Sequence, residues 1–125
     1  MMGLDVTHKV NVNKRIIQSI KSNNNKASLF FADLMEFYSK FNNEIYETDE
    51  SPLHDPCVIA YLIDNKLFYG KNAHVEVEEN SELTRGETVT DWWGVKKLKP
   101  NCNVVVEANT EKFFEILKLE LAKLN

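Results

Sequence analysis

The chain has 125 residues, the length of one domain, of which 43% are hydrophobic and 27% are charged. Its formal net charge is −4 and its lysines and arginines form no cluster, which argues against a surface built for nucleic acid. The longest apolar run, Pro56 to Ile63, is too short to cross a bilayer, and the first ten residues lack the layout of a secretory signal. We therefore expect a cytoplasmic protein with no nucleic-acid or membrane partner. Cys57 and Cys102 lack Cys-x-x-Cys spacing and are expected to be small buried or half-buried core residues, not disulfide, metal or redox groups.

The first half of the chain is expected to contain a short strand and two helices. The apolar run MMGLDV, residues 1–6, favours a buried strand. Apolar residues at helical spacing predict a helix over residues 12–21, which the polar run SNNNK then ends. A longer helix is predicted from Ala27 to about Asn43. Four of its apolar residues recur at helical spacing and are expected to face the core: Phe30, Leu34, Phe37 and Phe41.

The second half is expected to contain a buried helix, several strands and a final helix. The run Cys57–Ile63 is apolar on every face, which indicates a helix that is buried all round. Val75 and Val77 alternate with polar residues, as on a strand with one face in water, and further strands are expected between Leu83 and Trp93 and from Asn103. Asn109 or Thr110 can cap a last helix with one apolar face, formed by Phe113, Leu117, Leu121 and Leu124. Together these elements predict an α/β domain.

Two polar residues stand directly before the buried helix, in the stretch SPLHDPCVIAYLID at residues 51–64. Asp55 followed by Pro56 is typical of a helix start. The Asp side chain can accept a hydrogen bond from a free amide of the first turn, and proline fits the first helical position because the N–H that it lacks would have no partner in the helix. The start of a buried helix lies in the middle of a domain, where pockets usually form. His54 and Asp55 are therefore candidate site residues. The alternatives are a loop histidine bonded to a backbone carbonyl and an aspartate that only caps the helix.

Four segments, in order, resemble the C-terminal part of an inosine-uridine preferring nucleoside hydrolase. They are GLDVTHK (Gly3–Lys9), PLHDPCVIAYLID (Pro52–Asp64), HVEVEENSELTRGETVTDW (His74–Trp92) and the late strand and helix. The resemblance implies that residues 1–125 form the C-terminal portion of an α/β domain: a mostly parallel sheet with flanking helices and a small antiparallel element. The Asp-rich segment by which the family is chiefly recognised does not occur in this sequence. We therefore expect that an N-terminal part is missing, either because it is a second polypeptide or because this chain is a truncated product.

The resemblance implies a reaction, hydrolysis of the N-glycosidic bond of ribonucleosides to ribose and a free base around a bound Ca²⁺. It places two Ca²⁺ ligands in this chain: the backbone carbonyl of Thr7, at the end of its strand, and the carboxylate of Asp55, which also binds the substrate. His54 is implied to donate a proton to the departing base. Asn42 and Tyr46, one helical turn apart where the long helix ends, are implied to belong to a flap over the base.

Two functions of different classes are compatible with these features. The first is part of a nucleoside N-ribohydrolase that is catalytic only with its N-terminal complement, and the resemblance implies homo-oligomers of the complete enzyme. The second is a non-catalytic remnant or interaction module that keeps the fold without metal or activity. The presence of both His54 and Asp55 favours the first. His8 and His74 are expected to be structural, and Trp92 and Trp93 to serve packing or subunit contact.

Overall fold

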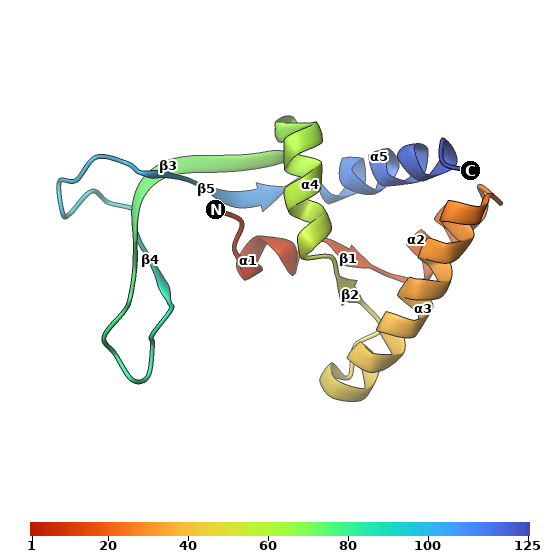
Figure 1. Cartoon of the computed structure of the whole chain (residues 1–125), viewed down its shortest axis with the longest axis horizontal. Coiled ribbons are helices and arrows are strands. Elements are labelled where there is room, and N and C mark those ends of the chain that lie inside the picture. The colour runs from red at the N-terminus through yellow and green to blue at the C-terminus, as the bar shows by residue number, and fades with distance from the viewer.

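The computed structural model describes residues 1–125 as an open, branched arrangement of helices and strands (Figure 1). Helices α2, α3 and α5 lie on one side of the molecule, a long β hairpin extends on the other, and α4 crosses between them. The elements in chain order are α1 (Leu4–Thr7), β1 (Asn11–Val12), α2 (Lys14–Lys21), α3 (Lys26–Tyr46), β2 (Ser51–Pro52), α4 (Asp55–Ile63), a 3₁₀ turn (Asn65–Leu67), β3 (Phe68–Val77), β4 (Thr88–Asp91), β5 (Cys102–Ala108) and α5 (Thr110–Ala122).

Both sheets are antiparallel, so the expected mostly parallel sheet is not found within these residues. The larger sheet has the order β4-β3-β5 and the smaller one pairs β1 with β2. The single parallel contact is an isolated bridge between Met2 and Val105. Parallel neighbours need a crossover connection, usually a helix, whereas β3, β4 and β5 follow one another through loops without a helix. The expected small antiparallel element is therefore the main sheet of this chain.

The strand predicted at residues 1–6 is limited to the bridge of Met2 with Val105, and the prediction was wrong for the residues that follow. Residues 4–7 form the short helix α1, in which the Val6 and Thr7 amides both donate to the Gly3 carbonyl. A short apolar run cannot by itself distinguish a strand from a buried helical turn. Asp5 in the first turn favours the helix, because a carboxylate there faces the free amides of the helix start. Thr7 consequently ends a helix, not a strand.

The predicted helices all form, and asparagine side chains cap three of them. Asn13 accepts a bond from Ile16 at the start of α2, Asn25 from Ser28 at the start of α3, and Asn109 from Lys112 at the start of α5. Of the predicted strands, β3 begins earlier than expected, at Phe68, and β5 forms as expected. Only Thr88–Asp91 of the region from Leu83 to Trp93 is a strand, β4.

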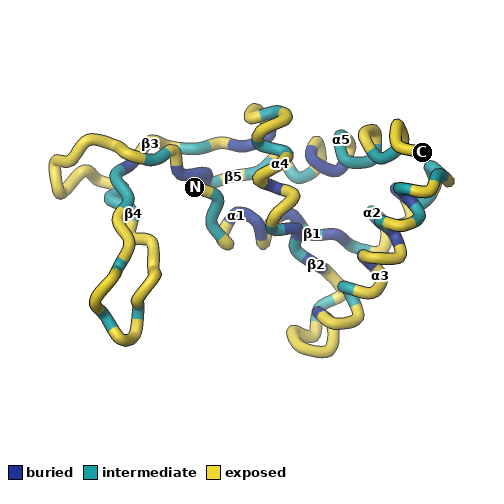
Figure 2. The backbone as a smooth tube through the Cα atoms, viewed as in Figure 1, coloured by how far each residue is buried: buried dark blue, intermediate teal, exposed yellow.

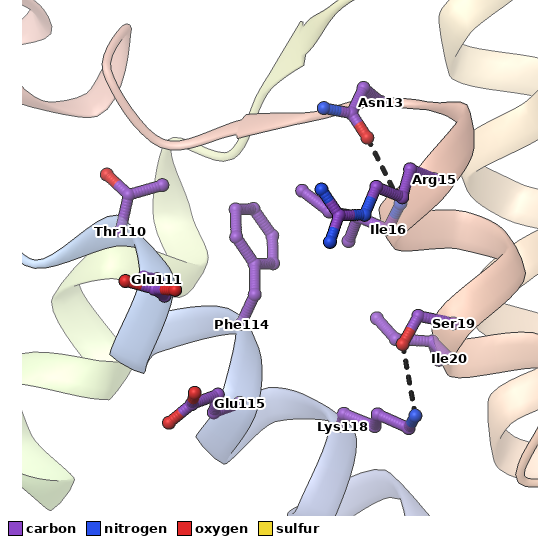
Figure 3. A pocket seen from close by; sticks show the side chains of 10 residues that line it. All are labelled: Asn13, Arg15, Ile16, Ser19, Ile20, Thr110, Glu111, Phe114, Glu115 and Lys118. Carbon is purple, nitrogen blue, oxygen red and sulfur yellow. Dashed lines mark hydrogen bonds between the residues drawn. The ribbon is translucent and has the colours of Figure 1, made fainter.

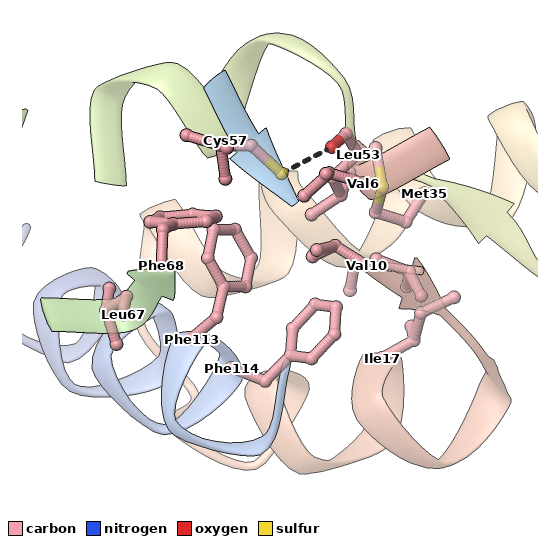
Figure 4. Close-up of a cluster of buried hydrophobic side chains, with 13 residues drawn as sticks. Val6, Val10, Ile17, Met35, Leu53, Cys57, Leu67, Phe68, Phe113 and Phe114 are labelled. Carbon is pink, nitrogen blue, oxygen red and sulfur yellow. Dashed lines mark hydrogen bonds between the residues drawn. The ribbon is translucent and has the colours of Figure 1, made fainter. Parts of the chain in front are cut away.

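The core is small and lies where α1, the small sheet, α4, β5 and α5 meet (Figure 4). Only 20 of the 125 residues are buried. Thirteen buried apolar residues form one cluster, in which Phe113 and Phe114 pack edge to face with ring centroids 5.1 Å apart. The cluster consists of Val6, Val10, Val12, Ile17, Ala32, Met35, Leu53, Cys57, Leu67, Phe68, Val105, Phe113 and Phe114.

Two helix faces that were predicted to be buried are exposed (Figure 2). The four apolar residues expected to bury one face of α3 are 48–73% exposed, and α3 packs instead through Ser28, Ala32 and Met35. In α4 only Cys57 is buried, while Val58, Ile59, Leu62 and Ile63 are exposed. The predictions that these two faces are buried were therefore wrong for this chain, because no other part of the chain lies over them. None of the helices is both long enough and apolar enough to span a membrane.

Candidate functional site

Two distant segments are held together at the candidate site. Strands β1 and β2 pair Asn11 with Pro52 and Val12 with Ser51, and the Leu53 amide donates to the Val10 carbonyl at 2.9 Å. This pairing places the end of α1 beside the start of α4. The Thr7 hydroxyl lies 2.8 Å from Nδ1 of His54, although 47 positions separate the two residues.

The start of α4 differs from the predicted cap. His54 occupies the cap position and Asp55 is the first helical residue, and the helix has no side-chain cap bond. The Asp55 carboxylate is exposed and forms no hydrogen bond or ion pair within the chain. An aspartate in a first helical turn is favoured by the helix dipole, yet here all its oxygen lone pairs are free for an external ligand. The prediction that Asp55 caps the helix through its side chain was therefore wrong.

Cys57 anchors the first turn of α4 in the core. Its thiol is completely buried and donates to the Leu53 carbonyl at 2.9 Å. Burial raises the pKa of the Cys57 thiol to about 11, because the charged thiolate is disfavoured in an apolar environment. Cys57 is therefore a neutral packing residue, as predicted. It holds the first turn of α4 against the core, and thereby the position of His54 and Asp55.

A hollow of about 370 Å³ lies beside His54, between the C-terminal half of α3 and the small sheet. The predicted flap residues Asn42 and Tyr46 line it together with His54, so the structure brings these three predicted site residues to one place. Asn42 is 3% exposed and its Nδ2 is a buried donor without a hydrogen-bond partner. An unpaired buried donor is costly, and a ligand oxygen in the hollow could satisfy it. The remaining lining residues are His8, Asn11, Tyr38, Phe41, Thr48, Glu50 and Pro52.

His8 is a residue of this hollow to which the sequence analysis gave no chemical role. Its ring centroid lies 5.1 Å from that of His54, with the ring planes inclined by 54°. The only signal in the sequence is its position directly after Thr7.

The predicted structural role of His74 agrees with its surroundings: Nδ1 lies 3.0 Å from the Lys99 carbonyl and Nε2 lies 3.2 Å from Glu76 Oε1, far along β3 from the hollow.

The two predicted metal ligands, Thr7, which contacts His54, and Asp55, which directly follows His54, do not form a complete metal site. No group of three or more His, Cys, Asp or Glu side chains that could hold a metal ion occurs in the structure. The Thr7 carbonyl accepts the Val10 amide at 3.0 Å and keeps one lone pair, and the Asp55 carboxylate is free. Ca²⁺ takes six to eight oxygen ligands. A carbonyl oxygen and a carboxylate are ligands that Ca²⁺ prefers, but two ligands do not complete its coordination.

Two other sizeable concave regions of the chain share no lining residue with the hollow beside His54. A larger hollow of about 500 Å³ separates α2 from α5, and Lys118 reaches across it to the Ser19 hydroxyl at 3.0 Å (Figure 3). None of the predicted site residues lines it. A groove of about 350 Å³ runs between α4 and α5, is lined mainly by apolar residues such as Ile59 and Ile63, and has Asp55 at its edge.

The segments that build this site match a known family. The profile of the inosine-uridine preferring nucleoside hydrolases matches residues 1–115. The pyrimidine-specific ribonucleoside hydrolase RihA of Salmonella arizonae is 36% identical over 118 residues, which are 94% of this chain and 38% of that protein. The RihA of Citrobacter koseri is 34% identical over 123 residues, 98% of this chain and 39% of the relative.

Solved structures agree with the family match. A purine-preferring ribonucleoside hydrolase from Gardnerella vaginalis superimposes with a TM-score of 0.81 at 27% identity, over 100% of this chain and 40% of that one. A plant nucleoside hydrolase has a TM-score of 0.80 at 23% identity, over 97% of this chain and 40% of its own, which shows a shared fold. The chain thus spans about 40% of the length of these relatives and matches their C-terminal part. It belongs to the inosine-uridine preferring nucleoside hydrolase family.

Proposed function

We propose that this chain is the C-terminal part of an enzyme that hydrolyses the N-glycosidic bond of ribonucleosides to ribose and a free base. The observation that carries the proposal is the position of His54. In the segment that the family profile matches, His54 stands at the cap of α4, next to the free carboxylate of Asp55, and lines a hollow with Asn42 and Tyr46. This reaction requires a proton donor and polar contacts at one hollow, which His54, Asn42 and Tyr46 supply. It also requires a carboxylate nearby, which Asp55 supplies from the position after His54 at the adjoining groove between α4 and α5.

His54 is proposed to donate a proton or hydrogen bond to the departing base. An imidazole exchanges protons near neutral pH, so it can be recharged by solvent after each turnover. The leaving base carries developing negative charge while the sugar acquires oxocarbenium character, and a donor at the base lowers that barrier. Asn42 and Tyr46 are proposed to contact the base or sugar from α3, since the buried amide of Asn42 lacks a partner in the chain.

Ca²⁺ is the proposed metal, with the Asp55 carboxylate and the Thr7 carbonyl as two of its oxygen ligands. When bound, the ion would orient the sugar hydroxyls and lower the pKa of a coordinated water. The remaining ligands are proposed to come from the part of the enzyme that this chain does not cover, because two oxygens do not complete the coordination of Ca²⁺.

The exposed surface supports completion by a further part of the enzyme. A compact monomer of 14.5 kDa is expected to expose about 6,900 Å², whereas this chain exposes 9055 Å². Val58, Ile59, Leu62 and Ile63 of α4 present an apolar face next to the groove with α5. Large exposed apolar faces mark surfaces that another part of a protein covers. We propose that the N-terminal part of the enzyme covers this face and brings its metal ligands to Asp55.

The hairpin of β3 and β4, together with the loops on either side of β4, is proposed as a subunit contact of the completed enzyme. The completed enzyme is proposed to act in the cytoplasm. Most of the segment around β4 is exposed (Figure 2), and Leu83 before this strand and Trp93 after it are 93% and 91% exposed. Exposed tryptophan is enriched at protein interfaces, because its large ring buries much apolar area on association.

The proposed activity can be tested in a completed protein, here defined as the N-terminal part of RihA from Salmonella arizonae fused in front of this chain. Ribose release is measured with uridine, cytidine, inosine and guanosine in the presence of Ca²⁺. We expect hydrolysis of at least one nucleoside, loss of that activity in EDTA, and none with the 125-residue chain alone. A folded fusion that releases no ribose from any of the four would refute the proposed function.

A further inference from the structure

Thr7 contacts His54, the residue before Asp55, through its side chain. The residue is 3% exposed at the end of α1, and its hydroxyl oxygen lies 2.8 Å from Nδ1 of His54. The same oxygen lies 3.5 Å from the Leu4 carbonyl, one turn back along the helix. No other hydrogen bond involves the ring of His54, so Nε2 has no partner in the chain.

The Thr7 hydroxyl can either donate to Nδ1 of His54 or accept a proton from it, because its oxygen also has lone pairs. Its only other contact, with the Leu4 carbonyl at 3.5 Å, is at the outer limit for a hydrogen bond, whereas 2.8 Å is a normal length. Donation to Nδ1 therefore gives the hydroxyl proton the shorter of its two available bonds. A neutral imidazole that accepts at Nδ1 carries its own proton on Nε2.

We propose that Thr7 is a positioning residue whose hydroxyl holds neutral His54 in the tautomer with the proton on Nε2. His8 limits rotation of the ring from a second side, since its ring lies 5.1 Å from that of His54. The proton is thus kept on the ring nitrogen that is left free beside the hollow. This inference rests on the proposed function for its meaning in catalysis, because only a proton on the free nitrogen can be given to a departing base.

The tautomer can be measured directly on the 125-residue chain by ¹⁵N NMR of the imidazole rings, at a pH where His54 is neutral. We expect a protonated Nε2 and an unprotonated, hydrogen-bonded Nδ1 in the wild type. Thr7→Val keeps the shape but removes the hydroxyl, and it should shift both His54 nitrogens toward averaged values. Thr7→Ser restores the hydroxyl and should restore the wild-type spectrum. His74 is an internal control, because its Nδ1 faces the Lys99 carbonyl and its signals should be the same in all three proteins.

The inference and the proposed function fail in different ways. A wild-type His54 with its proton on Nδ1, or a folded Thr7→Val protein with an unchanged His54 spectrum, overturns the inference whatever the activity. If Thr7→Val does not fold, the wild-type and Thr7→Ser spectra still decide the tautomer. In the completed protein, Thr7→Val should lower kcat for uridine on the order of tenfold with little change in KM, and Thr7→Ser should reverse most of that loss. Absence of any hydrolysis would refute the proposed function and leave the spectra to judge the tautomer.

Discussion

The Leu53 amide donates to the Val10 carbonyl at 2.9 Å, and this bond joins the two segments that carry the candidate site. Both residues are buried in the same core cluster. The bond continues the short pairing of β1 and β2 toward the start of α4. The contact between Thr7 and His54 therefore depends on the small sheet of β1 and β2. The packing of the core residues beneath this sheet should determine whether the contact forms.

Removal of the Leu53 side chain should destabilise the chain strongly. Leu53 is 5% exposed within the core cluster, and burial of this kind makes a Leu→Ala change cost about 2 to 5 kcal/mol. Urea unfolding followed by circular dichroism measures the change. Leu62→Ala is the matched control, since Leu62 is 76% exposed and its truncation should cost less than about 0.5 kcal/mol. Equal effects of the two substitutions would contradict the assignment of the core.

The two thiols should differ widely in reactivity. Cys57 is fully buried with a pKa raised from 9.0 to about 11, while Cys102 is partly exposed. A rise of this size lowers the thiolate fraction near pH 8 on the order of 100-fold, and burial blocks access as well. Labelling with a maleimide should modify Cys102 first, as read by mass spectrometry. Because the folded pKa of Cys57 is the higher one, its contribution to stability is present below pH 9 and is lost as the pH rises toward 11. Rapid modification of Cys57 in a folded Cys102→Ala protein would disprove the prediction that the buried Cys57 thiol is unreactive.

The loop after β4 should loosen in acid through Asp91. Its carboxylate accepts the Lys96 and Val95 amides, each at 2.9 Å, and these bonds lower the pKa of Asp91 below its ordinary value of 3.8. The stabilising contribution is therefore present above pH 3.8 and is lost as the pH falls through the lower folded value. Amide shifts of Val95 and Lys96, followed by NMR from about pH 6 to 2, should report a midpoint below 3.8. A midpoint at or above 3.8, or the same transition in Asp91→Ala, would be evidence against these bonds.

The sequence predicts the helices of this chain better than its sheets and its core. Helix caps and helical spacing are local, so α2, α3 and α5 follow from Asn13, Asn25, Asn109 and the residues behind them. Strand pairing is not local, and the resemblance to the family therefore led to a parallel sheet where this chain forms antiparallel ones. The apolar spacing of α3 and α4 predicts buried faces, but spacing alone does not say which part of a protein would cover them, and both faces are exposed in this chain.

The candidate site follows from the sequence only in part. The resemblance identified His54, Asn42 and Tyr46, which the structure brings around one hollow. The contact between the Thr7 side chain and His54 depends on the pairing of β1 with β2, two strands of two residues each that no periodicity could indicate. The same pairing brings His8 to His54, which is why its place in the site was not predicted.

Calcium binding should require Asp55 and the completed protein together. With only the two proposed oxygen ligands, the 125-residue chain should bind Ca²⁺ weakly, whereas the completed protein should bind it tightly. Asp55→Ala in the completed protein should weaken binding on the order of 100-fold, because a charged ligand is lost. Asp33→Ala removes an exposed carboxylate on α3 and is the control. Isothermal titration calorimetry measures both, and an unchanged affinity in Asp55→Ala would remove Asp55 from the metal site.

The most direct test of the account compares two leaving groups in the completed protein and in its His54→Ala variant. Uridine needs a proton donor for its departing base, whereas p-nitrophenyl riboside releases a stable phenolate that needs none. We expect His54→Ala to lower kcat for uridine by about 10² to 10⁴ and to change kcat for p-nitrophenyl riboside by less than about threefold. Equal loss with both substrates, or no loss with uridine, would contradict the central claim that His54 is the proton donor of this enzyme.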